Sequence, residues 1–227
     1  MLFIKTFFGV LFQTFLIATF LYLPALTLNW NDAFLLLCVH FSIACIASTY
    51  LVIYKPASIE ARMNYDSEAQ PQEDKLATAL MFSALILGFS LAPIDIFHLD
   101  FSSSFEGITK NIGLAIYVLG ILLAMASMIA NEFAETTVSI QEDRGQRVID
   151  NGIYSFVRHP MYTGFIILII GANIWLGTYL SLILSLIFLA IALSFRIRIE
   201  EKTLLKDLDG YEEYSKKVKF RLIPYLF

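Results

Sequence analysis

Residues 161–195 contain no charged side chain, and this run is too long to be a single membrane-spanning helix. A straight helix of that length would rise about 50 Å, whereas the hydrocarbon core of a bilayer is about 30 Å thick. The run must therefore turn back on itself. Two glycines and an asparagine, which favour turns, fall within 171–177. The sequence thus predicts a helical hairpin with arms at 162–172 and 178–195.

A polar motif stands at each end of this uncharged run: Arg158-His159-Pro160 before it and Glu200-Glu201 shortly after it. A hairpin returns the chain to the membrane surface that it left, so both motifs are expected on the same side. Arginine and histidine can donate hydrogen bonds to an anionic group, and carboxylates can accept them from hydroxyls or an amine. Alone, the first motif also fits ordinary interfacial anchoring and the acidic pair fits a solvated face, but their expected positions on one side together predict a site.

The composition indicates an integral membrane protein. Hydrophobic residues make up 58% of the 227 residues and charged residues 16%, and several apolar stretches reach membrane-spanning length. The predicted fold is an all-α integral membrane protein with about six membrane helical segments, the last two forming the hairpin, and a cytoplasmic C-terminal helix. Residues 1–130 would form four N-terminal transmembrane helices, and 131–227 would form the functional core. The four expected spans are 7–28, 33–54, 76–97 and 111–130.

The basic residues predict the orientation. With the N-terminus in the cytoplasm, every one of the 16 lysines and arginines except Lys110 lies on the cytoplasmic side, as the positive-inside rule requires. Both termini and both polar motifs are then cytoplasmic. Residues 55–75 are expected to form a flexible cytoplasmic loop. Arg196 and Arg198 are interpreted as ordinary positive-inside anchors.

The two cysteines, Cys38 and Cys45, lie seven residues apart in the second expected span and therefore on one helical face. Buried packing is the expected role of this pair. Neither a disulfide nor a metal site has the partners that it would need, because a CxxC pair is absent from the sequence. No metal is therefore expected.

The spacing of the C-terminal motifs resembles that of a known family. The motifs are Gly152-x-Tyr154-x-x-Val157-Arg158-His159-Pro160-x-Tyr162-x-Gly164, the apolar hairpin, Glu200-Glu201, Gly210-Tyr211-x-x-Tyr214 and Arg221-x-x-Pro224. The set is similar to the isoprenylcysteine carboxyl methyltransferases, which are grouped with the phospholipid methyltransferases as integral-membrane enzymes that use S-adenosylmethionine. The resemblance covers about 131–227, and within it 137–145 is similar to a bacterial branch. Ile153 stands where the family usually has proline.

The resemblance implies a membrane methyltransferase that acts on a lipophilic acceptor, with an isoprenylcysteine-type carboxylate as one option. The implied partners are a lipophilic small-molecule or lipid-anchored substrate and membrane lipids, without nucleic acid. The implied location is the bacterial inner membrane, with a cytoplasmic active site. The expected catalytic residues are Arg158, Arg221 and Glu200, and the expected cofactor-binding residues are Tyr154, His159, Tyr162, Gly164, Glu200 and Glu201.

Two other function classes stay open at this point. A sterol-reductase-like membrane oxidoreductase with a nicotinamide cofactor is one, because those reductases share a related C-terminal half, although they usually carry more spans. A non-catalytic membrane protein is the other. For methyl transfer, a carboxylate acceptor is already ionised at pH 7, whereas an amine or thiol would need a base such as a glutamate or His159. Glu201→Gln and His159→Ala are expected to weaken cofactor binding without unfolding the protein, because both positions would lie at the membrane–water boundary.

Overall fold

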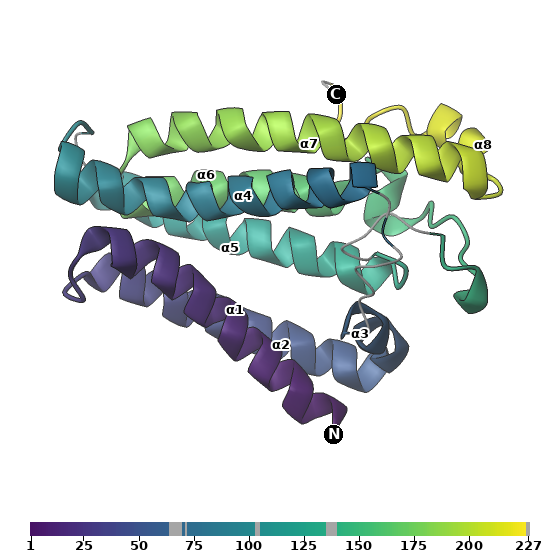
Figure 1. The fold of residues 1–227 in the computed structure, drawn as a ribbon, viewed down its shortest axis with the longest axis horizontal. Coiled ribbons are helices and arrows are strands. Elements are labelled where there is room, and N and C mark those ends of the chain that lie inside the picture. The colour runs from purple at the N-terminus through teal and green to yellow at the C-terminus, as the bar shows by residue number, and fades with distance from the viewer. Residues whose placement is uncertain (64–69, 71, 103–104, 135–139, 226–227) are drawn as a thin grey trace.

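The structure is a computed structural model that describes residues 1–63, 70, 72–102, 105–134 and 140–225. Within these ranges the regular elements are helical, and α4, α5, α6 and α7 form one bundle that α1 and α2 cross at an angle (Figure 1). The α-helices are α1 (Leu2–Ala25), α2 (Asn31–Tyr54), α3 (Pro56–Met63), α4 (Gln72–Ile94), α5 (Gly107–Ala130), α6 (Pro160–Leu176), α7 (Tyr179–Asp207) and α8 (Tyr211–Lys217).

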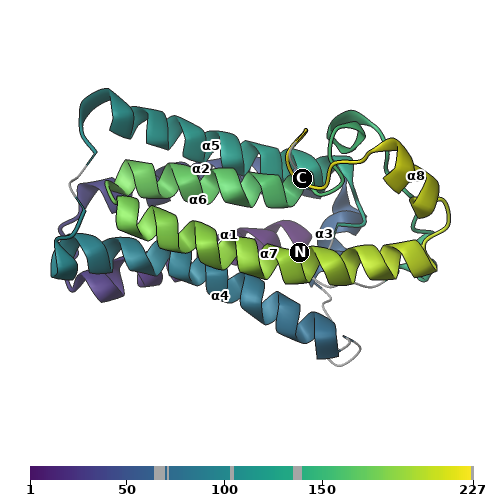
Figure 2. The same cartoon turned by 90° about the horizontal axis from the view of Figure 1, so that it is seen from above.

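Five helices in the described part of the chain are long and apolar enough to cross a membrane, namely α1, α2, α4, α5 and α7. They confirm the all-α multi-pass membrane fold, and the four expected N-terminal spans lie within a few residues of their predicted positions. Helix α6 has 17 residues and would rise about 25 Å, which is short for a crossing. It nevertheless runs between α5 and α7 along the bundle (Figure 2). The count of six membrane segments stays a prediction.

The hairpin is present, but its turn lies later than the sequence predicts. Helix α6 continues through Gly171 and Asn173, and it is closed by Gly177, whose φ of 88° is left-handed. Glycine is favoured at such a position because it has no Cβ to clash with the backbone. Thr178 then caps the start of α7 with its hydroxyl oxygen. The predicted arm ending at residue 172 was therefore too short.

Glycines let α5 and α6 approach each other backbone to backbone. A Cβ placed on Gly164 would lie 2.7 Å from a backbone nitrogen of α5, and one on Gly113 would lie 2.6 Å from a backbone nitrogen of α6. Gly120 and Gly171 are enclosed in the same way by backbone atoms of the opposite helix. Close packing of this kind is a main source of helix association in membranes. It explains why Gly171 lies inside a helix rather than in the turn.

At the end of the bundle that carries the α6–α7 turn, a buried carboxylate joins the end of α4 to the hairpin. Asp95 lies in a π-helical turn, Asp95–Leu99, and accepts hydrogen bonds from the hydroxyls of Ser102 and Thr178. The backbone N–H of Ser102 also donates to Asp95, at 3.2 Å. The next two serines lie outside the described residues. This network fixes the hairpin at the end opposite to the polar motifs.

At the end of the bundle that carries the polar motifs, the α2–α4 and α7–α8 connections both contain structure worth comparing with the sequence. The expected flexible loop at 55–75 contains α3, which begins at Pro56, and the first residues of α4, which begins at Gln72, so that prediction is wrong for 56–63 and 72–75. Residues 64–69 and 71 lie outside the described residues. Proline suits the first helical turn because its missing N–H would be unpaired there anyway. The C-terminal helical region is divided in two, since α7 ends at residue 207 and Gly210, with φ of 81°, precedes α8.

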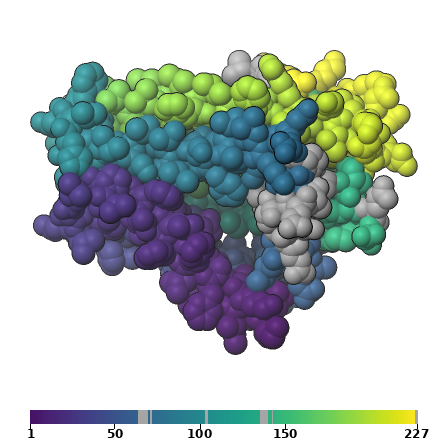
Figure 3. All heavy atoms as spheres, viewed as in Figure 1, coloured from purple at the N-terminus to yellow at the C-terminus, as the bar shows by residue number. Residues whose placement is uncertain are grey.

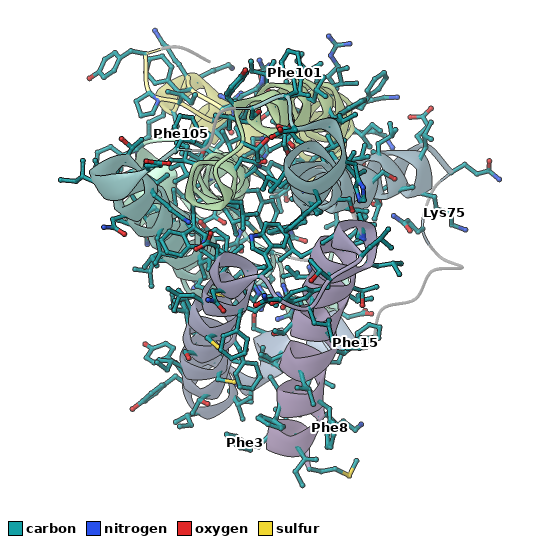
Figure 4. All side chains as sticks on the ribbon, turned by 90° about the vertical axis from the view of Figure 1, so that its left-hand side faces the viewer. Phe3, Phe8, Phe15, Lys75, Phe101 and Phe105 are labelled. Carbon is teal, nitrogen blue, oxygen red and sulfur yellow. The ribbon has the colours of Figure 1, made fainter. Side chains whose placement is uncertain are left out.

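The prediction that both cysteines are buried is wrong for Cys38, which is exposed, while Cys45 is half-buried. Helix α1 likewise turns large apolar side chains away from the bundle. Phe3, Phe8 and Phe15 are exposed, and Phe8 and Phe15 point outward from α1 (Figure 4). Lipid tails solvate such side chains as well as a protein core does, so hydropathy alone cannot tell which face is packed.

Candidate active site

The Arg158-His159 segment is held by the C-terminal tail of the chain. The backbone N–H of Arg158 donates to the carbonyl of Phe220 at 3.0 Å, and that of His159 donates to the carbonyl of Arg221 at 2.8 Å. Pro160 then starts α6, where its missing donor costs nothing. The tail therefore fixes the motif directly in front of the helix that carries the hairpin into the bundle.

Arg158 forms a bidentate ion pair with Glu201, which confirms that the two polar motifs converge. Its Nε lies 2.7 Å from Glu201 Oε1 and its Nη2 lies 2.8 Å from Glu201 Oε2. Its Nη1 donates to the carbonyls of Val218 and Lys219 at 2.6 and 3.1 Å. Both side chains of the pair are buried. The expectation that Arg158 donates to a bound anion is thus corrected, because these donors are directed at the protein itself.

His159 lies between the two adjacent glutamates. Its Nε2 is 2.9 Å from Glu201 Oε1, and its Nδ1 is 3.6 Å from Glu200 Oε1. Burial alone would lower the pKa of His159, but the two carboxylates outweigh burial and raise that pKa to about 8. With a carboxylate facing each ring nitrogen, the imidazole is held in its protonated form at neutral pH.

A second chain of contacts leads from Glu200 across α7 to α4. The hydroxyl of Tyr162 donates to Glu200 Oε2 at 2.5 Å, and Arg196 Nε donates to the same hydroxyl oxygen at 3.1 Å. Arg196 Nη1 lies 2.5 Å from Asp74 Oδ1. Arg196 is buried, so its interpretation as an interfacial anchor is wrong, whereas Arg198 is exposed. Buried arginines of this kind need such partners.

Arg158, His159, Tyr162 and Glu200 line a pocket at the end of the bundle that carries α8. The pocket holds about 810 Å³ of empty space, including its open mouth. Glu200 contributes a carboxylate to the wall, and Leu204 and Leu208 of α7 contribute apolar surface. Four tyrosines complete this part of the lining, namely Tyr154, Tyr162, Tyr211 and Tyr214. In the space-filling view, α8 and the end of α7 stand beyond the main bundle at this end (Figure 3).

The structure divides the expected site residues into two groups. Those lining the pocket are Tyr154, Arg158, His159, Tyr162 and Glu200. Glu201 lies behind them and is buried, and Arg221 contacts Glu201 through Nε at 3.4 Å. Gly164 lies in the contact between α5 and α6, so its small size serves helix packing rather than the approach of a ligand.

Several residues that shape the site carried no assignment from the sequence. The hydroxyl of Tyr211 donates to Glu201 Oε1 at 3.1 Å, and that of Tyr214 donates to the carbonyl of Tyr154 at 2.8 Å. Both tyrosines belong to the Gly210-Tyr211-x-x-Tyr214 spacing, which was the available signal. Asp74 also had a signal, because it is an acidic residue at the start of an apolar span.

Comparison with known proteins shows which families this chain is similar to. A phospholipid methyltransferase family profile matches residues 108–208. The protein-S-isoprenylcysteine O-methyltransferase of Schizosaccharomyces pombe is 35% identical over 102 residues, which are 44% of this chain and 43% of that protein. The chain therefore spans less than half the length of this relative.

Two further similarities are to a solved methyltransferase structure and to a sterol reductase. The solved structure of a eukaryotic intramembrane Ras methyltransferase, an isoprenylcysteine carboxyl methyltransferase, aligns with a TM-score of 0.55 at 19% identity, covering 93% of this chain and 73% of that one. The Delta(14)-sterol reductase of Saccharomyces cerevisiae is 29% identical over 174 residues, 68% of this chain but 40% of the reductase. The profile and the relatives show that the C-terminal part of the chain is similar to phospholipid methyltransferases and to isoprenylcysteine O-methyltransferases, and the solved structure shows that the fold is similar as well.

Proposed function

We propose that this chain is an integral-membrane methyltransferase that uses S-adenosylmethionine and acts on a lipophilic acceptor. The observation that carries the proposal is the Glu200 carboxylate, which faces a pocket at the end of the helix bundle and is oriented by Tyr162 and His159. S-adenosylmethionine bears a sulfonium and an ammonium group, and a carboxylate suits both. Tyrosine and leucine side chains in the same wall suit an adenine ring. The residues present therefore fit this cofactor.

The pocket residues need mainly to bind and align the reactants. The bound cofactor would supply a methyl group that is already activated, so most of the rate enhancement comes from proximity and orientation. Tyr162 and Met161 line the pocket at the first turn of α6, where a lipophilic acceptor coming from the bilayer would meet the cofactor. Glu200, Arg158 and Arg221 are the residues that we assign to the reaction centre and its support.

The state of His159 favours an acceptor that needs no general base. With a pKa of about 8 and a carboxylate near each ring nitrogen, His159 holds its proton at pH 7 and is poorly suited to remove one. A carboxylate acceptor is already ionised at this pH. The name of the fission yeast relative specifies O-methylation of isoprenylcysteine, and we propose the same chemical class of acceptor here.

The membrane orientation belongs to this proposal as well. Placing the pocket on the cytoplasmic side follows from the basic residues and gives a water-soluble cofactor direct access. Membrane lipids and a lipid-anchored or small lipophilic substrate would then be the partners. A bacterial inner membrane is the location that the motif at 137–145 suggests, whereas the relatives named above are eukaryotic; part of that motif, residues 137–139, lies outside the described residues.

The yeast sterol reductase keeps a second candidate function in view, because its similarity extends over 68% of this chain. Ligand-dependent thermal stability in detergent separates the two. A ligand at a hundred times its Kd stabilises the folded state by about 2.7 kcal/mol. We expect S-adenosylhomocysteine to raise the melting temperature and reduced nicotinamide cofactor to leave it unchanged. Stabilisation by the nicotinamide cofactor alone would instead identify an oxidoreductase, and no shift with either ligand would favour a non-catalytic protein.

A further inference from the structure

A buried ion pair lies directly behind the pocket and comes partly from outside the family-matched segment. Asp74, in the first turn of α4, is 1% exposed, and Arg196 of α7 is 4% exposed. Their closest atoms, Asp74 Oδ1 and Arg196 Nη1, are 2.5 Å apart. Gln70 Nε2 donates to the other carboxylate oxygen of Asp74 at 2.6 Å, and Thr78 accepts from Arg196 Nη1 at 2.8 Å. Asp74 is therefore held firmly beside the guanidinium.

Arg196 also faces the carboxylate of the pocket. Its Nε lies 3.9 Å from Glu200 Oε2, and it donates to the hydroxyl of Tyr162, which in turn donates to Glu200. Arg196 is thus positioned between two carboxylates, Asp74 on one side and Glu200 on the other. It makes its shorter contact with Asp74, and this leaves Glu200 bonded to Tyr162 at the pocket wall.

We propose that Asp74 is a positioning residue that holds the charge of Arg196 away from Glu200, and that this pair sets the preference of the pocket for the cationic sulfonium of S-adenosylmethionine over the neutral thioether of S-adenosylhomocysteine. The inference rests on the proposed function and deepens it. It assigns to α4, and not only to the hairpin, a part in distinguishing the methyl donor from its product.

The physical basis is the net charge around Glu200. S-adenosylmethionine and S-adenosylhomocysteine differ by one methyl group and one positive charge at sulfur. Charges in buried surroundings interact over several ångströms more strongly than charges in water do. Replacing Asp74 by asparagine would leave Arg196 with an unbalanced positive charge and direct it toward Glu200. That change should weaken both ligands through their shared ammonium group, and it should weaken the sulfonium ligand more than the thioether because only the sulfonium carries a charge at sulfur.

The test is a comparison of the two dissociation constants by titration calorimetry on the full chain in detergent. For Asp74→Asn we expect the preference for S-adenosylmethionine over S-adenosylhomocysteine to fall by about tenfold relative to wild type. Arg196→Gln should shift the same ratio in the opposite direction. The double variant Asp74→Asn/Arg196→Gln, which is neutral at both positions, should return the ratio to near its wild-type value.

Glu73→Gln provides a matched control. Glu73 is the neighbour of Asp74 on α4 and pairs with Lys202 of α7, but the pair is exposed and its atoms are 4.0 Å apart. Solvent screens such a pair, so its removal should leave the ratio unchanged. If Asp74→Asn does not fold, Arg196→Gln and the double variant still provide the comparison.

Equal losses of affinity for both ligands in Asp74→Asn would assign the pair to packing alone and overturn the inference, as would an unchanged ratio in every variant. In both cases wild-type binding would leave the proposed function standing. A wild-type protein that binds neither ligand would overturn the proposed function and this inference together.

Discussion

Two adjacent glutamates on α7 have different surroundings and therefore different expected roles. Glu201 is buried and accepts from Arg158, His159 and Tyr211. Glu200 lines the pocket and accepts from Tyr162. Glu201 thus holds together the segments that build the site, whereas Glu200 is presented to a ligand.

This difference predicts that substitution by glutamine mainly lowers stability at Glu201 and mainly lowers ligand affinity at Glu200. Glu201→Gln should destabilise the fold by about 3 kcal/mol, because it leaves Arg158 without its buried counter-charge. Glu200→Gln should lower the affinity for S-adenosylmethionine about tenfold with a smaller loss of stability. Thermal unfolding and calorimetry in detergent measure the two effects. The sequence-based prediction that Glu201→Gln leaves the protein folded assumed a residue at the membrane–water boundary, whereas Glu201 is buried. Equal stability of the two variants would contradict the structural role given to Glu201.

The raised pKa of His159 makes the stability of the fold depend on pH. Because the folded-state pKa is about 8 and the unfolded value is about 6.5, the protonated imidazole stabilises the protein below pH 6.5. The groups that face it are Glu200 and Glu201, and the ring of Tyr162 stacks on it; Arg158 and Tyr211 bond to Glu201. We expect about 2 kcal/mol of stability to be lost as pH rises from 6.5 through 8.

His159→Gln is the control for this pH effect, since glutamine can keep a hydrogen bond but does not titrate. Melting temperatures measured between pH 6 and 9 should decline more steeply for wild type than for this variant. Parallel curves would show that His159 is not protonated in the folded state.

The sequence could predict some contacts of the site and not others. The convergence of Arg158 and His159 with Glu201 followed from chain length alone, because a hairpin returns to its starting surface. The partnership of Asp74 with Arg196 joins residues 122 positions apart; the sequence marks Asp74 as an acidic residue at the start of an apolar span but does not show which residue it pairs with. Arg196 therefore resembled an ordinary anchor until its buried partner was known.

Among the elements, the contact between α5 and α6 gives the hairpin its place in the bundle. A side chain at Gly120 would meet backbone atoms of α6, whereas a Cβ on Gly9 of α1 would have no neighbour within 4 Å. Gly120→Leu should therefore cost at least 2 to 3 kcal/mol, roughly the range for overpacked cores. Gly9→Leu should leave the melting temperature almost unchanged or raise it slightly. Similar stabilities for the two variants would rule out the tight helix contact.

The position of the hairpin turn shows why helix ends were harder to predict than helix existence. Gly171 and Asn173 have turn-forming residue types, yet Gly171 contacts α5, and Asn173 is buried and donates to the carbonyl of Gly88 at 3.3 Å. Both serve contacts between helices. Gly177 fulfils the turn requirement, since its φ is positive. Glycine and asparagine can therefore serve either a turn or a close helix contact, and only the tertiary packing shows which.

Helix α8, which contributes Tyr211 and Tyr214 to the pocket, lies at the opposite end of the bundle from the α4–α5 connection (Figure 1). Single cysteines at Glu213 of α8 and at Glu106 before α5 should therefore label from opposite sides of the membrane. The native Cys38 and Cys45 must first be replaced, since Cys38 is exposed. With a membrane-impermeant reagent on intact cells, position 106 should react and position 213 should not. Labelling of position 213 from outside would reverse the proposed orientation.

Hydropathy was sufficient to predict the class of the molecule and most of its spans, because a bilayer selects for long apolar helices. It could not predict which face of each helix is packed, as Cys38 shows. It also could not reveal α3, whose eight residues mix polar and apolar types and which contacts α1 and α2.

Transfer of a labelled methyl group tests the proposed activity most directly. The protein in lipid vesicles would be incubated with S-adenosylmethionine carrying a tritiated methyl group and a small prenylated cysteine with a free carboxylate. We predict a base-labile methyl ester on the lipophilic acceptor, with wild-type protein giving far more product than Glu200→Gln. An acceptor that stays unlabelled, or equal labelling by wild type and Glu200→Gln, would contradict a methyltransferase site built around Glu200.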